Sequence, residues 1–454
     1  MSGPKISIYD LSPWARNNLN GQIRCERDCV ACAQQISAFL REATSYRLQI
    51  EKLITASELM ASRGVEPAVS QEKLQSLNNR LLEESEAIRK KLEEKMPTIT
   101  GKYEINDEAL AQKKAELERI RTLKKLAENL RNDLDEAVYQ GERSRVAATS
   151  EIEGSIAADL SSYFSFDDLA TVDDGPNTQE QIKAIENKLI LMQKTERLPE
   201  DLSGEITKAI AALGRVKTIE SVRLFNSVTM KNLENRIADY KANLVQQQEA
   251  FADKLARYQV LCVMLDREPV SYSFSTEASA MLEQEIDAME MAIIKQNEQQ
   301  YISECVDQVM SEMGYDLIGT RDVKKRNGKQ FHNELYSFDE GTAVNVTYSS
   351  DGQIAMELGG ISREDRLPTA EEAQALTEDM ETFCGEFAEF EKRLRAKGVI
   401  LGSRIAMSPP SADYAAIINV NDYEIDASKQ FSELSVAQKK KAKATGKKVL
   451  RRND

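Results

Sequence analysis

The chain has 454 residues, of which 30% are charged and 6% aromatic, and its formal net charge is −15. No apolar run reaches the roughly 18 residues that cross a membrane. The opening residues, Met-Ser-Gly-Pro-Lys, lack the apolar core of a signal peptide, so the six cysteines are expected to be reduced thiols of a cytoplasmic protein. The abundance of Glu, Gln, Lys, Ala and Leu favours long helices with narrow apolar seams over a wide globular core.

The first predicted helix begins at Ser12-Pro13, after a short extended lead-in over residues 1–10, and ends before Gly64. One stripe of this helix repeats at alternating steps of four and three residues for five heptads. The seam positions on this stripe include Cys25, Cys29, Cys32, Ile36, Phe39, Tyr46, Ile50 and Leu53. We therefore expect a coiled-coil helix whose first seam positions are cysteines.

The three cysteines also have the C-x3-C-x2-C spacing that radical-SAM enzymes use, which makes a cysteine-ligated metal site an alternative hypothesis. Such a cluster is held on a loop inside a β/α barrel. On a straight helix these thiols spread over about 10 Å, too far for one metal ion. Because the surrounding sequence predicts no barrel, we favour cysteine as a small apolar filler and predict no metal and no cofactor.

Two further helices are expected before an acidic linker. A helix over residues 70–96 carries leucines on one face, and a helix from about Asp107 carries a similar stripe past Gly141, a residue type that weakens helices. The short break between the first two helices predicts an antiparallel hairpin. Residues 165–177 are rich in aspartate and are expected to form the linker.

A second heptad run follows two short helices, which are expected at about residues 178–197 and 203–213. Apolar residues recur every seven positions, while Gln247 and Lys254 interrupt the companion row. The seam positions are Met230, Ile237, Leu244, Phe251, Tyr258 and Leu265. At 1.5 Å per residue, this helix is expected to present roughly 50 Å of seam.

The pattern changes from helical to alternating after a further helix over residues 276–313. Ser349-Ser350-Asp351-Gly352 is typical of a tight turn, and Thr369 with Glu372 forms a capping box that opens a helix to about Lys397. Strands are expected at residues 315–323, 331–338, 343–348, 353–358 and 399–407. These strands and helices predict a small antiparallel meander covered on one face by helices.

The predicted fold is mainly α, with long antiparallel coiled-coil helices followed by a small α+β module that contains an antiparallel meander. The expected regions are N-terminal coiled-coil hairpins over 1–164, the acidic linker over 165–177, a second coiled-coil region over 178–268, the α+β module over 276–407 and a flexible tail with a basic end over 408–454.

Two basic clusters are candidate contacts for phosphate groups. One lies on the expected hairpin tip of the module, and the other contributes eight Lys or Arg side chains and no acid over residues 439–452. The candidates are Arg321, Lys324, Lys325, Arg326 and Lys329 on the tip, and Lys439, Lys440, Lys441, Lys443, Lys447, Lys448, Arg451 and Arg452 in the tail. A solvated turn and a solubilising terminus are the alternative interpretations.

The sequence contains no recognisable catalytic pattern. Its single histidine, His332, cannot build a two-histidine metal site, and we expect it to be structural or solvent-facing. The Gly-Lys pair at residues 328–329 is followed by Gln330, where a P-loop requires Ser or Thr. We therefore predict that the protein is not an enzyme.

The function predicted from these features is a non-enzymatic scaffold or adaptor subunit of a cytoplasmic multiprotein assembly. Its coiled coils would self-associate or dock protein partners, and its α+β module would recognise a partner. One alternative is an accessory subunit of a nucleic-acid machine, in genome maintenance or phage defence, that contacts phosphates through the basic tail. The cysteine-ligated metalloprotein is the second alternative.

Overall fold

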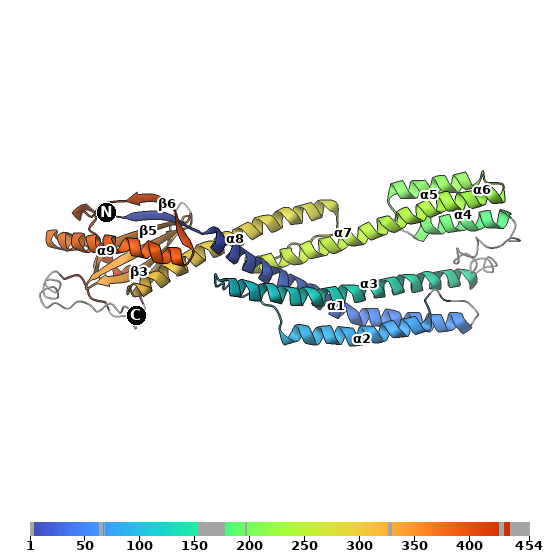
Figure 1. Ribbon diagram of the computed structural model, residues 1–454, viewed down its shortest axis with the longest axis horizontal. Coiled ribbons are helices and arrows are strands. Elements are labelled where there is room, and N and C mark those ends of the chain that lie inside the picture. The colour runs from blue at the N-terminus through green and yellow to red at the C-terminus, as the bar shows by residue number, and fades with distance from the viewer. Residues whose placement is uncertain are drawn as a thin grey trace. The chain divides into compact units, whose positions relative to one another are not determined.

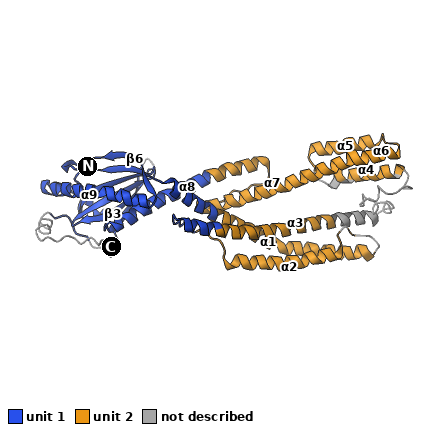
Figure 2. Ribbon diagram, viewed as in Figure 1, with its two compact units in different colours: residues 1–25, 100–114, 288–454 blue, residues 26–99, 115–287 orange. Residues whose placement is uncertain are grey.

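The structure is a computed structural model that describes residues 4–62, 67, 69–152, 178–195, 198–325, 329–425 and 431–435. Helices make up most of it, and its strands form one largely antiparallel sheet. The chain divides into two compact units (Figure 2). Unit 1 holds residues 1–25, 100–114 and 288–454, and unit 2 holds residues 26–99 and 115–287. No helix in the described part is long and apolar enough to cross a membrane.

These units differ from the consecutive regions expected from the sequence. Residues 1–25 and 100–114 join the sheet unit, although both lie within the region 1–164 that was predicted to form coiled-coil hairpins. Strand pairing and helix packing bring together segments that are far apart in the sequence. Changes of composition along the chain do not reveal such contacts. The predicted acidic linker over 165–177 lies outside the described residues.

Three long helices build the first apolar core of unit 2 (Figure 1). They are α1 (Pro13–Ser62), α2 (Gln71–Glu94) and α3 (Asp107–Ile152). The Ser12 hydroxyl accepts a hydrogen bond from the Ala15 N–H at 3.3 Å, and the Ser70 hydroxyl accepts one from the Lys73 N–H at 3.3 Å. Both serines therefore satisfy amides that a helix start leaves unpaired, as the sequence predicted for Ser12.

The predicted seam of α1 is buried within the chain itself. Ile36, Phe39, Ile50 and Leu53 pack with apolar residues of α2 and α3, and Tyr46 packs against the same core. The first two cysteines of the seam are buried and the third is partly buried. The repeat of four and three residues thus marks the face of α1 that packs in a three-helix core. This repeat does not by itself show that the helices form a supercoil.

Gly141 lies inside α3 and does not end the helix. A Cβ atom at this position would lie 2.7 Å from Leu53 Cδ1 of α1, so a larger residue would displace the leucine. Glycine therefore lets α3 approach α1 closely at this point, which offsets its weak helix propensity.

The second heptad run is helical, but it is buried mainly at its two ends. It begins in a π-helical turn over Asn226–Met230, after α6 (Ile219–Phe225), and continues through α7 (Lys231–Met264). Met230 and Ile237 share a core with residues of α4 (Thr178–Thr195) and α5 (Glu200–Leu213). Phe251 and Tyr258 are buried further along, whereas Leu244 and Leu265 are partly exposed. No residue from 238 to 250 is buried.

The sheet of unit 1 has the strand order β6-β1-β5-β4-β3-β2-β8, and β7 pairs with β5 outside this row. The predicted meander is present, because β2 to β5 pair antiparallel with one another in turn. These strands are β2 (Leu317–Lys324), β3 (Gln330–Asp339), β4 (Thr342–Ser349) and β5 (Gln353–Ser362). Gly352 has φ +85° in the turn between β4 and β5, a conformation that favours glycine.

The N-terminal residues form an inner strand of this sheet instead of a lead-in. Strand β1 (Lys5–Leu11) pairs antiparallel with β5 on one side and with β6 (Val399–Met407) on the other. The alternation of Ile6 and Ile8 fits a strand, but a strand of seven residues does not reveal its partners. The partners come from residues more than 340 positions away.

Helices α8 (Thr276–Glu312) and α9 (Ala370–Ala396) cover the same face of the sheet, which we call the inner face (Figure 1). The Tyr336 hydroxyl, on this face, lies 3.2 Å from Asp307 Oδ1 of α8. At the start of α9, Thr369 and Glu372 exchange both hydrogen bonds of the predicted capping box. Both helices of the α+β module thus lie on one face of its sheet.

Lys5 is buried between the sheet and α9. Its side chain is on the inner face, the residue is 1% exposed, and Nζ lies 3.9 Å and 4.5 Å from the ring centres of Phe383 and Phe387. Burial lowers the pKa of Lys5 to about 8, because the ammonium group loses its hydration. The aromatic rings replace part of that hydration through cation–π contact.

Residues after Met407 cover part of the opposite, outer face of the sheet. Val420 packs with Ile318 and Leu335, and the Leu434 N–H donates to the Ile361 carbonyl at 2.9 Å. Strands β7 (Ile417–Asn419) and β8 (Glu424–Ile425) also join the sheet. The expected flexible tail over 408–454 is therefore corrected for these residues, while residues 436–454 lie outside the described part of the chain.

Candidate functional site

A groove crosses the inner face of the sheet at one end of unit 1. It has a volume of about 780 Å³ and is lined by the ends of β1, β2 and β4 and by the starts of β3 and β5. Asp322, His332, Tyr348 and Ile354 are successive cross-strand neighbours along it. Neighbouring strands lie about 4.8 Å apart, so the five strands span about 19 Å. The floor of the groove is therefore a row of side chains from distant parts of the chain.

One face of α8 forms a wall of the groove. The lining residues of this helix recur at helical spacing and so share one face. They are Lys295, Glu298, Gln299, Ile302 and Ser303. Arg16 lies 2.9 Å from Glu298 and 3.2 Å from Asp10, which follows the part of β1 that pairs with β5. This shared arginine ties the wall of the groove to its β1 end.

His332 lies in the floor of the groove between two carboxylates. Its Nδ1 is 2.7 Å from Asp322 Oδ1, and its Nε2 is 3.4 Å from Glu334 Oε1. The Asp322 side chain is 87% exposed and the Glu334 side chain is 12% exposed. The imidazole therefore lies between an exposed carboxylate and a largely buried one. Its ring centre lies 6.1 Å from that of Tyr348. The chain's single histidine is thus a partly exposed element of the groove.

Two tyrosines donate to the buried carboxylate of this floor. The Tyr336 and Tyr348 hydroxyls lie 2.6 Å and 2.9 Å from Glu334 Oε2. Burial raises the pKa of both tyrosines, and the negative charge of Glu334 raises it further. Both phenols therefore keep the proton that they donate at neutral pH. Together with Asp307, this network holds β3, β4 and α8 in one arrangement.

Some charged side chains that line the groove have ion-pair partners and others do not. Each of its four carboxylates has a partner, namely Arg16 for Asp10 and Glu298, His332 for Asp322, and Lys329 for Asp351. Lys295 of α8 and Lys324 of β2 are exposed, and neither makes an ion pair with any residue that the structure describes. The groove is therefore lined by charges of both signs, and its carboxylates outnumber its lysines.

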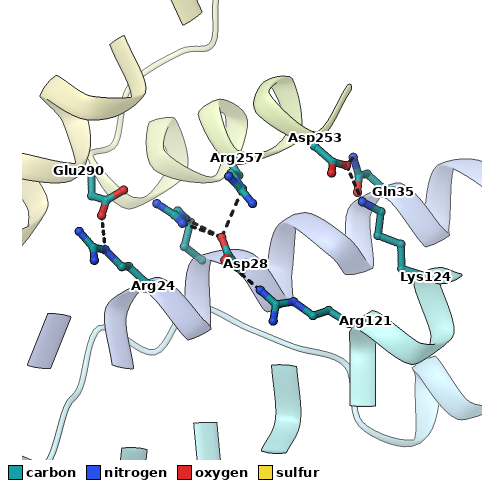
Figure 3. A network of polar contacts seen from close by, with 9 residues as sticks. Arg24, Asp28, Gln35, Arg121, Lys124, Asp253, Arg257 and Glu290 are labelled. Carbon is teal, nitrogen blue, oxygen red and sulfur yellow. Dashed lines mark hydrogen bonds and ion pairs between the residues drawn. The ribbon is translucent and has the colours of Figure 1, made fainter. Parts of the chain in front are cut away.

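Unit 2 contains a different polar cluster, centred on Asp28 of α1 (Figure 3). The Asp28 carboxylate lies 2.7 Å from Arg27, 3.5 Å from Arg257 of α7 and 3.8 Å from Arg121 of α3. Asp28 and Arg27 have side chains that are 14% and 8% exposed, so this pair is largely screened from water. One carboxylate thus joins three helices.

The polar row of α1 continues on both sides of Asp28 (Figure 3). Gln35 and Lys124 both donate to Asp253 Oδ1, at 2.8 Å and 2.5 Å, which again links α1, α3 and α7 within unit 2. In unit 1, Arg24 pairs with Glu290 of α8. Each of these contacts links residues of two different helices of this chain.

The predicted cysteine stripe lies in a packed part of α1. None of the six cysteines forms a disulfide. Burial raises the pKa of the Cys32 thiol, which favours the neutral thiol over the thiolate that binds metals. Among the residues that the structure describes, no group of three His, Cys, Asp or Glu side chains is placed to hold a metal ion.

The predicted phosphate contacts on the β2–β3 hairpin mostly have partners already. Arg321 pairs with Asp422 at 2.7 Å, Lys325 Nζ lies 4.7 Å from the centre of the Phe331 ring, and Lys329 pairs with Asp351 at 3.1 Å. Lys324 differs from them because it reaches the groove without an ion pair in the described chain. Arg326 and the eight candidates of the tail lie outside the described residues.

Sequence analysis did not single out Asp322, Glu334, Tyr348 or Lys295. One signal was present, because His332, Glu334 and Tyr336 alternate along β3 and therefore share a face. This titratable row lies on the face that α8 covers. The sequence does not show that residues of β2, β4 and α8 complete the row, since these contacts depend on strand register and helix packing.

Comparisons with protein-family models, with curated proteins and with solved structures found no match to this chain. The interpretation of the groove therefore depends on its own residues and geometry.

Proposed function

We propose that this protein is a non-enzymatic adaptor subunit of a multiprotein assembly, and that unit 1 recognises a partner protein through the groove. The observation that carries the proposal is the groove itself, about 780 Å³ in volume and built by five strands and one face of α8. A concave surface with a few convergent polar groups on a rigid scaffold is typical of a recognition site.

The polar network of the floor supports recognition more than acid–base chemistry. Both ring nitrogens of His332 face carboxylates, and both tyrosine hydroxyls are directed at Glu334. No Ser, Thr or Cys hydroxyl or thiol is hydrogen-bonded to the imidazole in the described part of the chain. A nucleophile beside a base is the usual mark of covalent catalysis, so this arrangement instead favours a floor of fixed shape.

The test places the photo-crosslinking residue p-benzoylphenylalanine at Gln299, in the wall of the groove, within the full chain. A matched variant carries it at Glu381, an exposed position of α9 that does not line the groove. In the native host cells, Gln299 is expected to crosslink one discrete protein that Glu381 does not. The complex is then reconstituted from the two purified proteins. Identical products from both positions, or no reconstituted complex, would overturn the proposal.

A further inference from the structure

We propose that Lys5 and Cys384 form a site of oxidative modification, where a hydroperoxide oxidises the thiol and the lysine amine then bonds to the sulfur. The two side chains meet between β1 and α9 in unit 1, and neither residue lines the groove. This inference is independent of the proposed adaptor function. It rests on the isolation of the Lys5 amine, on its contact with Cys384 and on the access of solvent to that thiol.

The Lys5 amine has no partner that would hold it in the charged form. Lys5 is 1% exposed, and its Nζ has no hydrogen-bonded oxygen or nitrogen partner in the described part of the chain. Glu391 is the carboxylate that acts on Lys5, but it lies 2.6 Å from Arg404 and also accepts from the Tyr9 hydroxyl at 3.3 Å. An ammonium group buried without a carboxylate partner costs free energy, so this environment favours the neutral amine more than water does.

The Cys384 thiol lies beside this amine. Cys384 is on α9 between Phe383 and Phe387, the two residues whose rings contact the Lys5 ammonium. Among the polar neighbours of Lys5, the Cys384 thiol has the largest effect on the lysine. Cys384 is only partly buried, and the next residue, Gly385, is exposed and adds no side chain to cover it. A small oxidant therefore reaches the thiol from solvent, while the amine stays buried.

The proposed chemistry has two steps, and hydrogen peroxide is the oxidant. In the first step, the Cys384 sulfur attacks the peroxide, the O–O bond breaks, and the products are a sulfenic acid and water. In the second step, the neutral Lys5 Nζ attacks that sulfur, an N–S bond forms and the S–O bond breaks. The leaving hydroxide takes a proton from the nitrogen and departs as water. The sulfur thus gives two electrons to the peroxide, and a dithiol reductant returns them and restores the thiol and the amine.

A second lysine–cysteine pair, in unit 2, provides a contrast. Cys32 of α1 is also partly buried, and Lys124 of α3 acts on its thiol. Burial opposes the charge of Lys124, but Asp253 at 2.5 Å and Glu128 at 3.2 Å outweigh it and raise the lysine pKa. Burial lowers the pKa of Lys5 to about 8, so roughly one Lys5 amine in ten is neutral at pH 7. Of the two amines, Lys5 is therefore the available nucleophile.

The test treats the reduced full-length protein with hydrogen peroxide at neutral pH. The protein is then digested with trypsin in the absence of reductant and analysed by mass spectrometry. A bond at Lys5 blocks cleavage there, so residues 1–16 are expected to be joined to residues 367–392, at their summed mass less two hydrogen atoms. Dithiothreitol is expected to remove this product. Absence of the product from the oxidised protein would overturn the proposal.

Two variants identify the atoms that form the bond. Lys5→Met and Cys384→Ala are each expected to abolish the product. Dimedone traps sulfenic acids, and it is expected to label Cys384 at least about fivefold more in Lys5→Met than in the unchanged protein, because no amine then consumes the sulfenic acid. Equal labelling of Cys384 in the two proteins would overturn the proposal. Circular dichroism checks that both variants are folded.

Two comparisons test whether the folded site directs the reaction. The pair Cys32–Lys124 is expected to give no crosslink in the folded protein, because its lysine stays charged. Protein unfolded in urea is expected to give no Lys5–Cys384 product, because the two residues are then far apart. A Lys5–Cys384 product of equal yield in urea would overturn the proposal, and so would a Cys32–Lys124 product of equal yield in the folded protein.

Discussion

The groove of unit 1 and the Asp28 cluster of unit 2 are both polar, but they use their charges differently. Around Asp28, each of Arg121, Lys124 and Arg257 has a carboxylate partner on another helix of unit 2 (Figure 3). In the groove, one arginine is shared by two carboxylates, Asp322 faces a histidine, and Lys295 and Lys324 make no ion pair in the described chain. The difference teaches that a polar cluster whose pairs close within the chain stabilises the fold. A cluster whose charged side chains are only partly paired keeps groups that a partner can contact.

The largest effect is expected in the apolar core beside the Asp28 cluster. Leu130 of α3 is 0% exposed and packs in the three-helix core. Leu130→Ala is expected to lower the free energy of unfolding by about 2–5 kcal/mol, measured by denaturant titration, because it leaves a cavity. Leu126, on the same helix, is 44% exposed, and Leu126→Ala is the control with an expected change within about 0.5 kcal/mol. Equal losses in the two variants would contradict the described core.

Removal of the shared carboxylate is the next test. Asp28→Ala is expected to cost about 1–3 kcal/mol, because Arg27 is largely buried and loses this charged partner. The control is Glu42→Ala, since Glu42 and Arg131 form a pair whose side chains are 54% and 37% exposed. An exposed pair contributes about 0–1 kcal/mol. If both variants unfold at the same denaturant concentration, the Asp28 cluster does not join the helices as described.

Lys5 provides a test of charge burial in unit 1 without a ligand. Lys5→Met is expected to stabilise the protein by about 1–3 kcal/mol at pH 7, because the methionine keeps the packing and removes the buried charge. The pKa of Lys5 is lowered to about 8 in the folded protein, against 10.5 for an ordinary lysine. The unfolded chain therefore binds more protons between pH 8 and 10.5, so the stability of the unchanged protein rises with pH across that window.

The measurement for Lys5 is the unfolding free energy of both proteins at pH 7 and pH 10. The advantage of Lys5→Met should shrink at pH 10, where the folded lysine is already neutral. Lys102→Met is the control, because Lys102 is exposed and its substitution should give no pH-dependent difference. A constant difference between Lys5→Met and the unchanged protein at both pH values would rule out a depressed lysine pKa.

The smallest effect on stability is expected in the groove. Lys295→Ala and Lys324→Ala should change the free energy of unfolding by no more than about 0.5 kcal/mol, because neither exposed side chain has an ion pair in the described chain. A destabilisation as large as that of Asp28→Ala would show that the two clusters do not differ as proposed.

Local patterns in the sequence were sufficient to predict many elements of the fold. The repeat of four and three residues predicts the buried face of α1, and the alternating strands predict the meander of β2 to β5. The Thr369–Glu372 capping box forms at the start of α9 as expected. These features depend on residues close together in the chain, where helix and strand periods dictate which side chains share a face.

The candidate site was not predictable in the same way. Sequence analysis named Lys324 and weighed His332, but it placed neither in a groove and did not name Lys295. Their meeting depends on pairing between β1 and β5, whose partners are separated by more than 340 residues, and on the packing of α8 across the strand ends. The alternating pattern of a strand does not show which distant strand it pairs with.

The sequence by itself determined where the helices and the meander lie, because the hydrophobic period and the caps are local properties of the chain. Tertiary structure alone decided that residues 5–11 complete the sheet, that Lys5 is buried against Phe383 and that two lysines remain unpaired at a groove. The physical reason is that burial and ion pairing depend on which distant segments meet. That choice is made by the packing of the whole unit.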